Sequence, residues 1–202
     1  MKNIGRFRTF VVSMTRLVDQ HAQNESAILD DAAELVRSLV IHDDWIPREF
    51  TVPSSHAYRQ YLLHCDALER FCVVSFVWLP TQRTPVHDHL TWGVIGQMRG
   101  DELCQEYTVE ENGKARVDAM HRMRPGDVDR VSPQIGDVHA VAHGGGADPA
   151  ISIHVYGANI GAVRRHRFDV TSGNVSAFVS GYDSAVMPNL WDRSKEPAER
   201  SV

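Results

Sequence analysis

The sequence predicts a mainly β protein, a barrel or jelly roll of short strands preceded by a small helical region. Two observations carry this prediction. Between residues 58 and 170, short runs rich in Val, Ile, Phe and Tyr recur, each bounded by Gly, Pro or Asn, as is typical of antiparallel strands. In residues 5–40 the apolar positions instead recur at steps of three and four, as on one face of a helix.

The length and composition indicate one soluble globular domain. The chain has 202 residues, of which 43% are hydrophobic and 23% are charged, as in ordinary folded proteins. We expect an N-terminal helical region over residues 1–50 that packs on the barrel. The barrel itself is expected over 51–180, and a polar tail over 181–202.

Charge and cysteine content exclude several classes of partner. The net charge is −5 and the sequence has no basic run, which argues against nucleic-acid binding. No apolar stretch reaches the ~20 residues that a membrane-spanning helix needs. The three cysteines form no C-x-x-C pair, so we expect a reducing compartment and place the protein in the cytoplasm.

Along the chain, helix periodicity gives way to strand patterns after "DDWIPREF". An Asn-Gly pair in "ENGK", residues 111–114, predicts a hairpin between its two neighbouring strands. The predicted strands lie at 58–65, 70–79, 92–100, 101–110, 114–123, 127–133, 137–144, 150–158 and 163–170.

A pair of histidines is the first candidate for chemistry. In "TPVHDHLTWG", His87 and His89 are two residues apart, so a strand would place both imidazoles on one face, about 7 Å apart. His139 begins another predicted strand after a glycine-containing turn in "PQIGDVHAVAH". His143 is the rival to His139 as a third ligand.

These blocks resemble a known family. "HDHLTWGVIGQMRG", followed about 40 residues later by "PQIGDVHAV", resembles the two motif blocks of the cupin superfamily, a double-stranded β-helix barrel that holds a metal in its mouth. The run "DVHAVAHGGGADPAISIHVYG" resembles the cysteine dioxygenase family of thiol dioxygenases, most closely the bacterial 3-mercaptopropionate dioxygenases. The resemblance covers roughly residues 55–170.

The resemblance implies a ferrous cofactor held by His87, His89 and His139, and oxidation of a small thiol by O₂ to a sulfinate. The usual cupin block places a glutamate ligand a few residues after the histidine pair, whereas this chain has "LTWGV" there. Three neutral histidines leave Fe(II) with its full charge and open positions, which suits an anionic thiolate beside O₂.

A second set of polar residues follows on the strand "SIHVY". Ser152, His154 and Tyr156 alternate, so they share one face of the strand and can hydrogen-bond in series. The resemblance implies that this Ser-His-Tyr relay is catalytic. Animal cysteine dioxygenases crosslink this tyrosine to a cysteine, but the matching residue is Gly93, so no thioether is expected at Tyr156.

The substrate-binding residues follow from the same resemblance. Where animal enzymes carry an arginine two residues after a tyrosine, this chain has Gln60. In "GAVRRHRFD", Arg165 matches an arginine of the 3-mercaptopropionate dioxygenases, and the resemblance implies that it binds the substrate carboxylate. Arg164 and Arg167 remain alternatives, and Arg165 shares a strand face with Arg167.

The expected substrate is 3-mercaptopropionate, because a pocket without a dedicated amino-group partner need not select an α-amine. L-cysteine is the alternative within the class, and mercaptosuccinate remains open. A non-enzymatic cupin that binds a metal or a small molecule is the alternative from another class. A different metal chemistry on the same barrel, such as isomerisation or carbon–carbon bond cleavage, also remains open.

Overall fold

The computed structural model describes residues 3–22, 24–110 and 113–184. The chain starts with two helices, α1 (Ile4–Gln20) and α2 (Glu25–Val40), and a 3-10 turn, η1 (Arg48–Thr51). Eleven strands follow within the described residues: β1 (Arg59–Cys65), β2 (Cys72–Trp78), β3 (Val86–His87), β4 (Gly93–Arg99), β5 (Glu102–Val109), β6 (Ala115–Met123), β7 (Val128–Val131), β8 (His139–His143), β9 (Ala150–Tyr156), β10 (Arg165–Phe168) and β11 (Val175–Phe178).

The strands form two antiparallel sheets with the strand order of a jelly roll. One described sheet has the order β1-β2-β9-β4-β7 and the other β11-β10-β3-β8-β5-β6. Strands β2 to β9 therefore supply four to each sheet, in the orders β2-β9-β4-β7 and β3-β8-β5-β6, which is the arrangement of two Greek keys in a jelly roll. The predicted mainly β fold, a double-stranded β-helix after a helical region, is confirmed.

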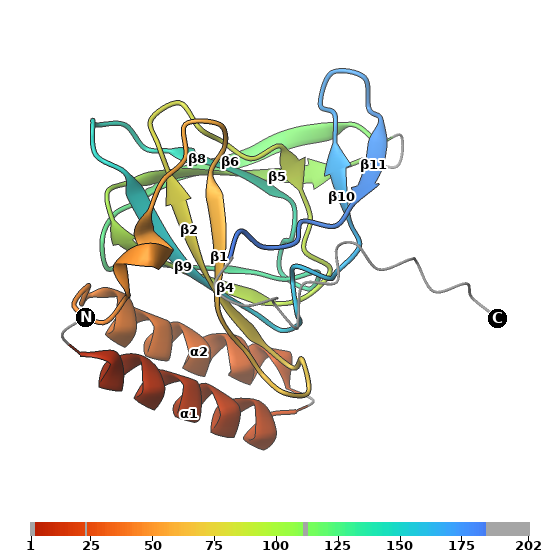
Figure 1. Ribbon diagram of the computed structural model, residues 1–202. Coiled ribbons are helices and arrows are strands. Elements are labelled where there is room, and N and C mark those ends of the chain that lie inside the picture. The colour runs from red at the N-terminus through yellow and green to blue at the C-terminus, as the bar shows by residue number, and fades with distance from the viewer. Residues whose placement is uncertain (1–2, 23, 111–112, 185–202) are drawn as a thin grey trace.

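The helices cover the outer face of the five-stranded sheet (Figure 1). Asn24 begins α2, since its side chain accepts a hydrogen bond from the amide of Ala27 at 3.1 Å. Val36 and Val40 of α2 are buried against β4, where a Cβ at Gly96 would stand only 2.4 Å from Val36 Cγ1. Glycine at this position therefore allows the helix to approach the sheet closely.

Strand β9 lies in the middle of the five-stranded sheet and is buried on both faces. Ile151, Ile153 and Val155 pack in the core that includes the helices. The alternate residues, Ser152, His154 and Tyr156, face the interior of the barrel, as their pairing with Phe76, Val74 and Cys72 of β2 requires. The helical layer thus backs the strand that presents the polar relay.

The structure differs from the predicted elements in a few places. β3 comprises only Val86 and His87, so His89 lies beyond the end of the strand. β11 (Val175–Phe178) had no predicted counterpart, because its exposed residues show no hydrophobic alternation. The predicted hairpin is present, with Val109 paired to Ala115, although residues 111–112 of its turn lie outside the described residues. Of the predicted tail over 181–202, only residues 181–184 are described.

In the described part of the chain, neither helix is long and apolar enough to pass through a lipid bilayer.

Candidate metal centre

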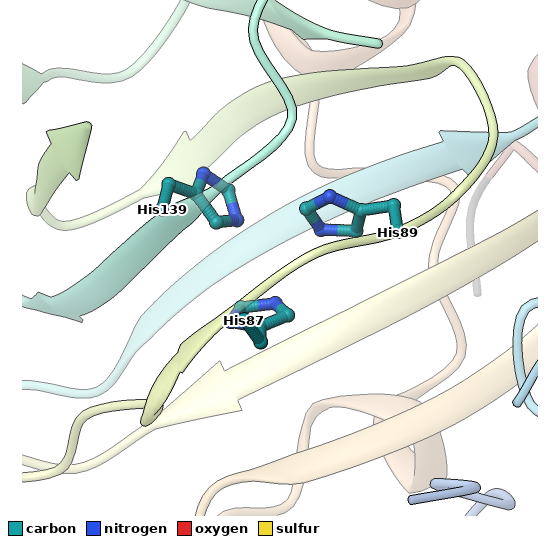
Figure 2. A group of neighbouring side chains, drawn as sticks. All are labelled: His87, His89 and His139. Carbon is teal, nitrogen blue, oxygen red and sulfur yellow. The ribbon is translucent and has the colours of Figure 1, made fainter. Parts of the chain in front are cut away.

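Three histidines from two neighbouring segments meet inside the barrel, with their rings directed toward one another (Figure 2). His87 ends β3 and is the antiparallel partner of His139, the first residue of β8. The ring centroids of His87, His89 and His139 lie 4.8 to 5.0 Å from one another. One potential ligand atom from each residue lies within 4.8 Å of the others, so the group could hold a metal ion.

Each imidazole of this group is oriented through its Nδ1 atom. Nδ1 of His87 lies 3.0 Å from the carbonyl oxygen of Pro85, and Nδ1 of His139 lies 3.5 Å from Sγ of Cys104. Nδ1 of His89 lies 2.9 Å from Oδ1 of Asp137. These contacts leave Nε2 of each ring for a ligand-binding role.

The Nε2 atom of His89 gives the clearest sign that this group fits a metal. His89 is fully buried, and its Nε2 has no hydrogen-bond partner among the described residues. A buried polar atom without a partner is costly, and coordination to a cation would satisfy it. The three predicted ligands are therefore gathered as a metal site requires.

Asp137 fixes the segment that carries His89. Its carboxylate accepts hydrogen bonds from the backbone amides of His89 at 3.1 Å and Leu90 at 2.9 Å, as well as the contact with the His89 ring. Leu90 has a φ of 58°, a conformation that bulky residues rarely adopt. Burial is the largest single effect and raises the pKa of Asp137, but the hydrogen bonds and charge of His89 and the amide of Leu90 together lower the pKa overall.

Sequence reasoning missed Asp137, although it stands two residues before His139 in "GDVH". The carboxylate lies on the Nδ1 side of His89 and is not part of the ligand group. Asp137 orients the His89 ring and is not one of the three residues that could hold an ion. Among the described residues, the group at this centre consists of histidines alone.

Electrostatics favour the neutral form of these rings. Burial, followed by the neighbouring His89, lowers the pKa of His87 and of His139 well below the usual value. A histidine must be unprotonated at the ligating nitrogen to bind a metal. His87 and His139 therefore offer uncharged donors near neutral pH.

The relay predicted on β9 is formed. Oγ of Ser152 lies 2.8 Å from Nε2 of His154, and Nδ1 of His154 lies 2.8 Å from the hydroxyl oxygen of Tyr156. The Tyr156 ring stacks on His89, with centroids 5.3 Å apart and planes 21° apart. Phe76 covers the His154 ring at a centroid distance of 4.1 Å. The relay thus leads from the interior of the barrel to a histidine of the metal centre.

Arg165 is the arginine of its segment that points inward. It is 4% exposed, whereas Arg164 and Arg167 are exposed. Its Nη2 donates to Oγ of Ser180 at 2.8 Å, and its Nε has no partner among the described residues. The Cζ atoms of Arg165 and Arg167 lie 4.7 and 4.3 Å from the centroid of Phe178.

The charge of Arg165 affects the pKa of a histidine in the metal centre. It lowers the pKa of His87, after burial and His89. Burial lowers the pKa of Arg165 itself. No described carboxylate forms a salt bridge with this guanidinium group. A buried cation next to the histidines is thus left with hydrogen-bonding capacity for an anion.

Gln60 lies on β1, where it pairs with Phe76 and shares the barrel-facing side of the sheet. Its backbone amide donates to Oδ2 of Asp183 at 2.8 Å, and its carbonyl oxygen accepts from the Asp183 amide at 2.7 Å. The structure places Gln60 on the same inner face as the relay, but among the described residues no hydrogen bond joins its side chain to Arg165.

Position 93 is next to the relay tyrosine. Gly93 is the register partner of Tyr156, and a Cβ there would stand 2.9 Å from Tyr156 Cδ1 and from Val131 Cγ2. The glycine leaves the space that the tyrosine ring occupies. It also supplies no sulfur at this position, which is the basis of the prediction that Tyr156 carries no thioether.

His143 lies outside the histidine group. One of its ring nitrogens contacts the carbonyl oxygen of Asp148, and the other accepts from the amide of Gly145, both at 3.0 Å. A second group that could bind a cation comprises Cys104, His121 and Asp129. Its members already contact one another or their neighbours, with His121 Nε2 3.0 Å from Asp129 Oδ2.

A cavity of about 410 Å³ lies between the two helices and is lined by residues such as Phe10 and Leu39. None of the three histidines lines it. A smaller one of about 210 Å³ borders the metal centre at His139. Its lining includes Cys104, Glu106 and Asp129. The carboxylates make this side of the centre acidic, in contrast to the side that carries Arg165.

No protein-family model matches the chain. Similar solved structures include a double-stranded β-helix protein from Klebsiella pneumoniae, 20% identical over 55% of this chain and 80% of that chain, with a TM-score of 0.43. A cupin 2 domain protein from Halorhodospira halophila is 16% identical over 58% and 74%, with a TM-score of 0.45. An oxalate oxidase bound to glycolate is 14% identical over 52% and 53%, with a TM-score of 0.42. Scores this low carry no functional inference, and the fold assignment rests on the strand order.

Proposed function

We propose that the protein is a non-haem Fe(II) thiol dioxygenase that oxidises a small mercapto-carboxylate to its sulfinate, with 3-mercaptopropionate as the first candidate. The observation that carries the proposal is the group of three buried histidines, which includes no carboxylate and in which burial lowers the pKa of His87 and of His139. A ligand set without negative charge suits an anionic substrate better than a set with a carboxylate would.

The residues present fit such an ion. His87, His89 and His139 would hold it, each oriented by a contact at Nδ1. When bound, Fe(II) supplies a positive charge that favours the thiolate form of the substrate and the redox capacity to activate dioxygen.

The reaction balances as one thiol and one O₂ giving one sulfinate and one proton. Both oxygen atoms of O₂ end on sulfur, which loses four electrons, and O₂ gains the same four. The S–H bond and the O–O bond are broken, and two S–O bonds are formed. No external reductant is required.

Arg165 would bind the carboxylate of the substrate. Its guanidinium group is buried and has no carboxylate partner among the described residues, while its Nε is unpaired. The planar group can make two parallel hydrogen bonds to a carboxylate. Because β10, which carries Arg165, pairs with β3, which carries His87, an anchored carboxylate would bring its thiol close to the histidines.

The hydroxyl of Tyr156 would donate a hydrogen bond to the reacting atoms. Its hydroxyl contacts Nδ1 of His154, and its ring lies against His89. Burial raises the pKa of Tyr156, so the phenol keeps its proton and can act as a donor. Ser152 and His154 position this hydroxyl.

The ranking of substrates rests on two positions. Gln60 in place of an arginine, and Gly93 in place of a cysteine, favour 3-mercaptopropionate over L-cysteine. L-cysteine is the alternative, and mercaptosuccinate, with a second carboxylate, is a further one. Comparison of kcat/KM for the three thiols with the iron-loaded protein tests this ranking, and a clear preference for L-cysteine would overturn it.

The activity itself is tested by O₂ uptake. The iron-loaded chain should consume one O₂ per thiol and release a sulfinate, and a His139→Ala variant should do neither. If the wild-type protein holds iron and yet consumes no O₂ with any of the three thiols, a non-enzymatic binding role or another metal chemistry is supported instead. Thiol-free O₂ uptake by the same sample is the baseline.

A further inference from the structure

A buried carboxyl group lies at the inner end of the Ser-His-Tyr relay. Glu102 is the first residue of β5, and its side chain is fully buried. Polar side chains of the opposite sheet act on the pKa of its carboxyl, namely Ser152 on β9, its register partner Gln97 on β4, and Trp78 on β2, although none of them completes a hydrogen bond to it. Glu102 therefore reaches the relay from the opposite sheet.

The unpaired polar atoms around Glu102 suit a carboxylic acid better than a carboxylate. Both carboxyl oxygens, Nε1 of Trp78 and Oε1 of Gln97 are buried and complete no hydrogen bond with a described residue. Trp78 can only donate, and Oε1 of Gln97 can only accept, since the Gln97 amide nitrogen already donates to the carbonyl oxygens of Arg99 and Gly100. A protonated carboxyl offers one donor and one acceptor to this pair, whereas a carboxylate offers acceptors alone.

We propose that Glu102 is a positioning residue that sets the direction of the hydrogen bonds in the relay, and so decides whether Tyr156 donates or accepts a hydrogen bond at the metal centre. The relay can point only one way at a time, because each of its hydroxyls has one proton and a neutral imidazole has one N–H. The group at its inner end therefore determines the order of the rest.

With Glu102 ionised, the Ser152 hydroxyl donates to the carboxylate. Its oxygen then accepts the N–H of His154 at Nε2, so Nδ1 carries no proton and accepts from Tyr156. In this state the proton of Tyr156 is directed at His154, and the phenol oxygen presents lone pairs to the metal centre.

With Glu102 protonated, the Ser152 hydroxyl is released to donate to Nε2 of His154. The ring proton then lies on Nδ1 and is donated to the oxygen of Tyr156. The Tyr156 proton is free to point at the metal centre. The two states differ by one proton, since each remaining proton only moves to the other side of its own hydrogen bond.

The same shift can deliver a proton to the site. As Tyr156 gives up its proton, it takes the one on Nδ1 of His154, Nε2 takes that of Ser152, and Ser152 takes that of Glu102, which is left ionised. This use of the relay rests on the proposed function, whereas the coupling between Glu102 and His154 does not.

The surroundings of Glu102 leave its protonation responsive to pH. Burial raises its pKa to about 7, against the lowering effects of the donors Ser152 and Trp78. The titratable groups nearest on the packed strands are His154 on β9, His143 as the register partner on β8, and Cys104 on its own strand. Burial lowers the pKa of His154 well below the usual value and raises that of Cys104, so both stay neutral.

The position of the His154 proton tests the proposal by ¹⁵N NMR of the full-length chain with labelled histidine, loaded with diamagnetic Zn²⁺. As pH rises through about 7, the His154 proton should move from Nδ1 to Nε2. In Glu102→Gln, a neutral isostere, it should remain on Nδ1 throughout. In Ser152→Ala, which leaves Glu102 in place but disconnects it, the pH response should also be lost.

A wild-type tautomer that ignores pH, or an unchanged response in Glu102→Gln, would overturn the proposal. If Glu102→Gln fails to fold, the Ser152→Ala comparison decides in the same way. Because the measurement involves no thiol and no O₂, an inactive protein would refute the proposed function and leave this result standing.

Discussion

Gly93 and Tyr156 face each other across β4 and β9, so closely that a single methyl group on the glycine would stand 2.9 Å from Cδ1 of the tyrosine ring. The ring of Tyr156 is at the same time stacked on His89 and bonded through its hydroxyl to His154. The space over Gly93 is therefore part of what holds the tyrosine in place, and it offers a direct test of the relay.

Gly93→Ala should displace Tyr156 or Val131, since a Cβ would meet both at 2.9 Å. Overpacking of this kind costs typically 1–3 kcal/mol, so about that loss in the free energy of unfolding is expected. The His154–Tyr156 hydrogen bond should weaken in the same variant, as the ¹⁵N shift of Nδ1 would report. Gly5→Ala, where the new Cβ meets only the side chain of Asn3 at 3.5 Å, is the control.

Removal of one ligand should abolish tight metal binding. His139→Ala is expected to lower Fe(II) affinity by well over tenfold in anaerobic titration, because two imidazoles rather than three remain. His143→Ala, on the same strand but bonded to Asp148 and Gly145, should bind the metal as the wild-type protein does. Chelation of the metal should lower Tm in the wild type and in His143→Ala, but not in His139→Ala. Equal affinity in both variants would remove His139 from the site.

Asp137→Asn tests the carboxylate that orients His89. The neutral amide keeps the shape of the side chain but loses the charged acceptor for the His89 ring and the two amides. Substitutions of residues that orient metal ligands typically cost 10- to 100-fold in affinity, and a loss of about that size is expected here. Metal content after dialysis against a graded chelator series measures it. An unchanged affinity would mean that the Asp137 contact only shapes the loop.

Arg165→Lys should raise KM for 3-mercaptopropionate and lower kcat/KM by about tenfold to a hundredfold. Lysine keeps the charge but loses the two parallel hydrogen bonds. Oxidation of 2-mercaptoethanol, which has no carboxylate, should change little. Arg164→Lys, in the exposed neighbour, serves as the matched control. Equal losses with both thiols would show that Arg165 supports the structure and does not bind the carboxylate.

Glu102→Gln should stabilise the protein in a pH-dependent way. Burial raises the pKa of Glu102 from 4.5 to about 7, so between these values the folded state keeps a proton that the unfolded state has released. Stability therefore falls as pH rises from about 4.5 to 7 in the wild type, by up to roughly 3 kcal/mol, and the variant escapes this loss.

Urea titrations from pH 4 to 9 would show this as a gap between the two proteins that opens over that interval and stays constant above it. Glu106→Gln, which removes a half-exposed carboxyl from the same strand, controls for the change in net charge. A gap of the same size at every pH would mean that the pKa of Glu102 is not raised in the folded state.

The parts of the fold that periodicity encodes were predictable from the sequence. Strand β9 alternates polar residues toward the interior, and this alone placed Ser152, His154 and Tyr156 on one face. The meeting of His87 with His139 was expected from the family resemblance, because strand register between distant segments leaves no local pattern. β11 was missed for the opposite reason, since its exposed residues carry no alternation.

Asp137 and Glu102 were beyond sequence reasoning. An aspartate just before a strand, such as Asp137, is typical of an ordinary turn. Its contact with His89 depends on the relative position of two loops that are distant in the sequence. Glu102 begins a strand, a position where an acidic residue is normally solvated. Only the closure of the barrel shows that it is enclosed.

Strand β9 is enclosed on both sides, with helix-facing and site-facing residues in alternation. Val36 and Ile153 are fully buried, so a larger side chain at either position cannot be accommodated by moving into solvent. It must instead displace neighbouring residues of β9. Substitutions in the N-terminal helices should accordingly alter reactivity without touching a ligand. A mutational scan should therefore find positions in the helical layer where substitutions change activity, although no helix residue lies in the histidine group.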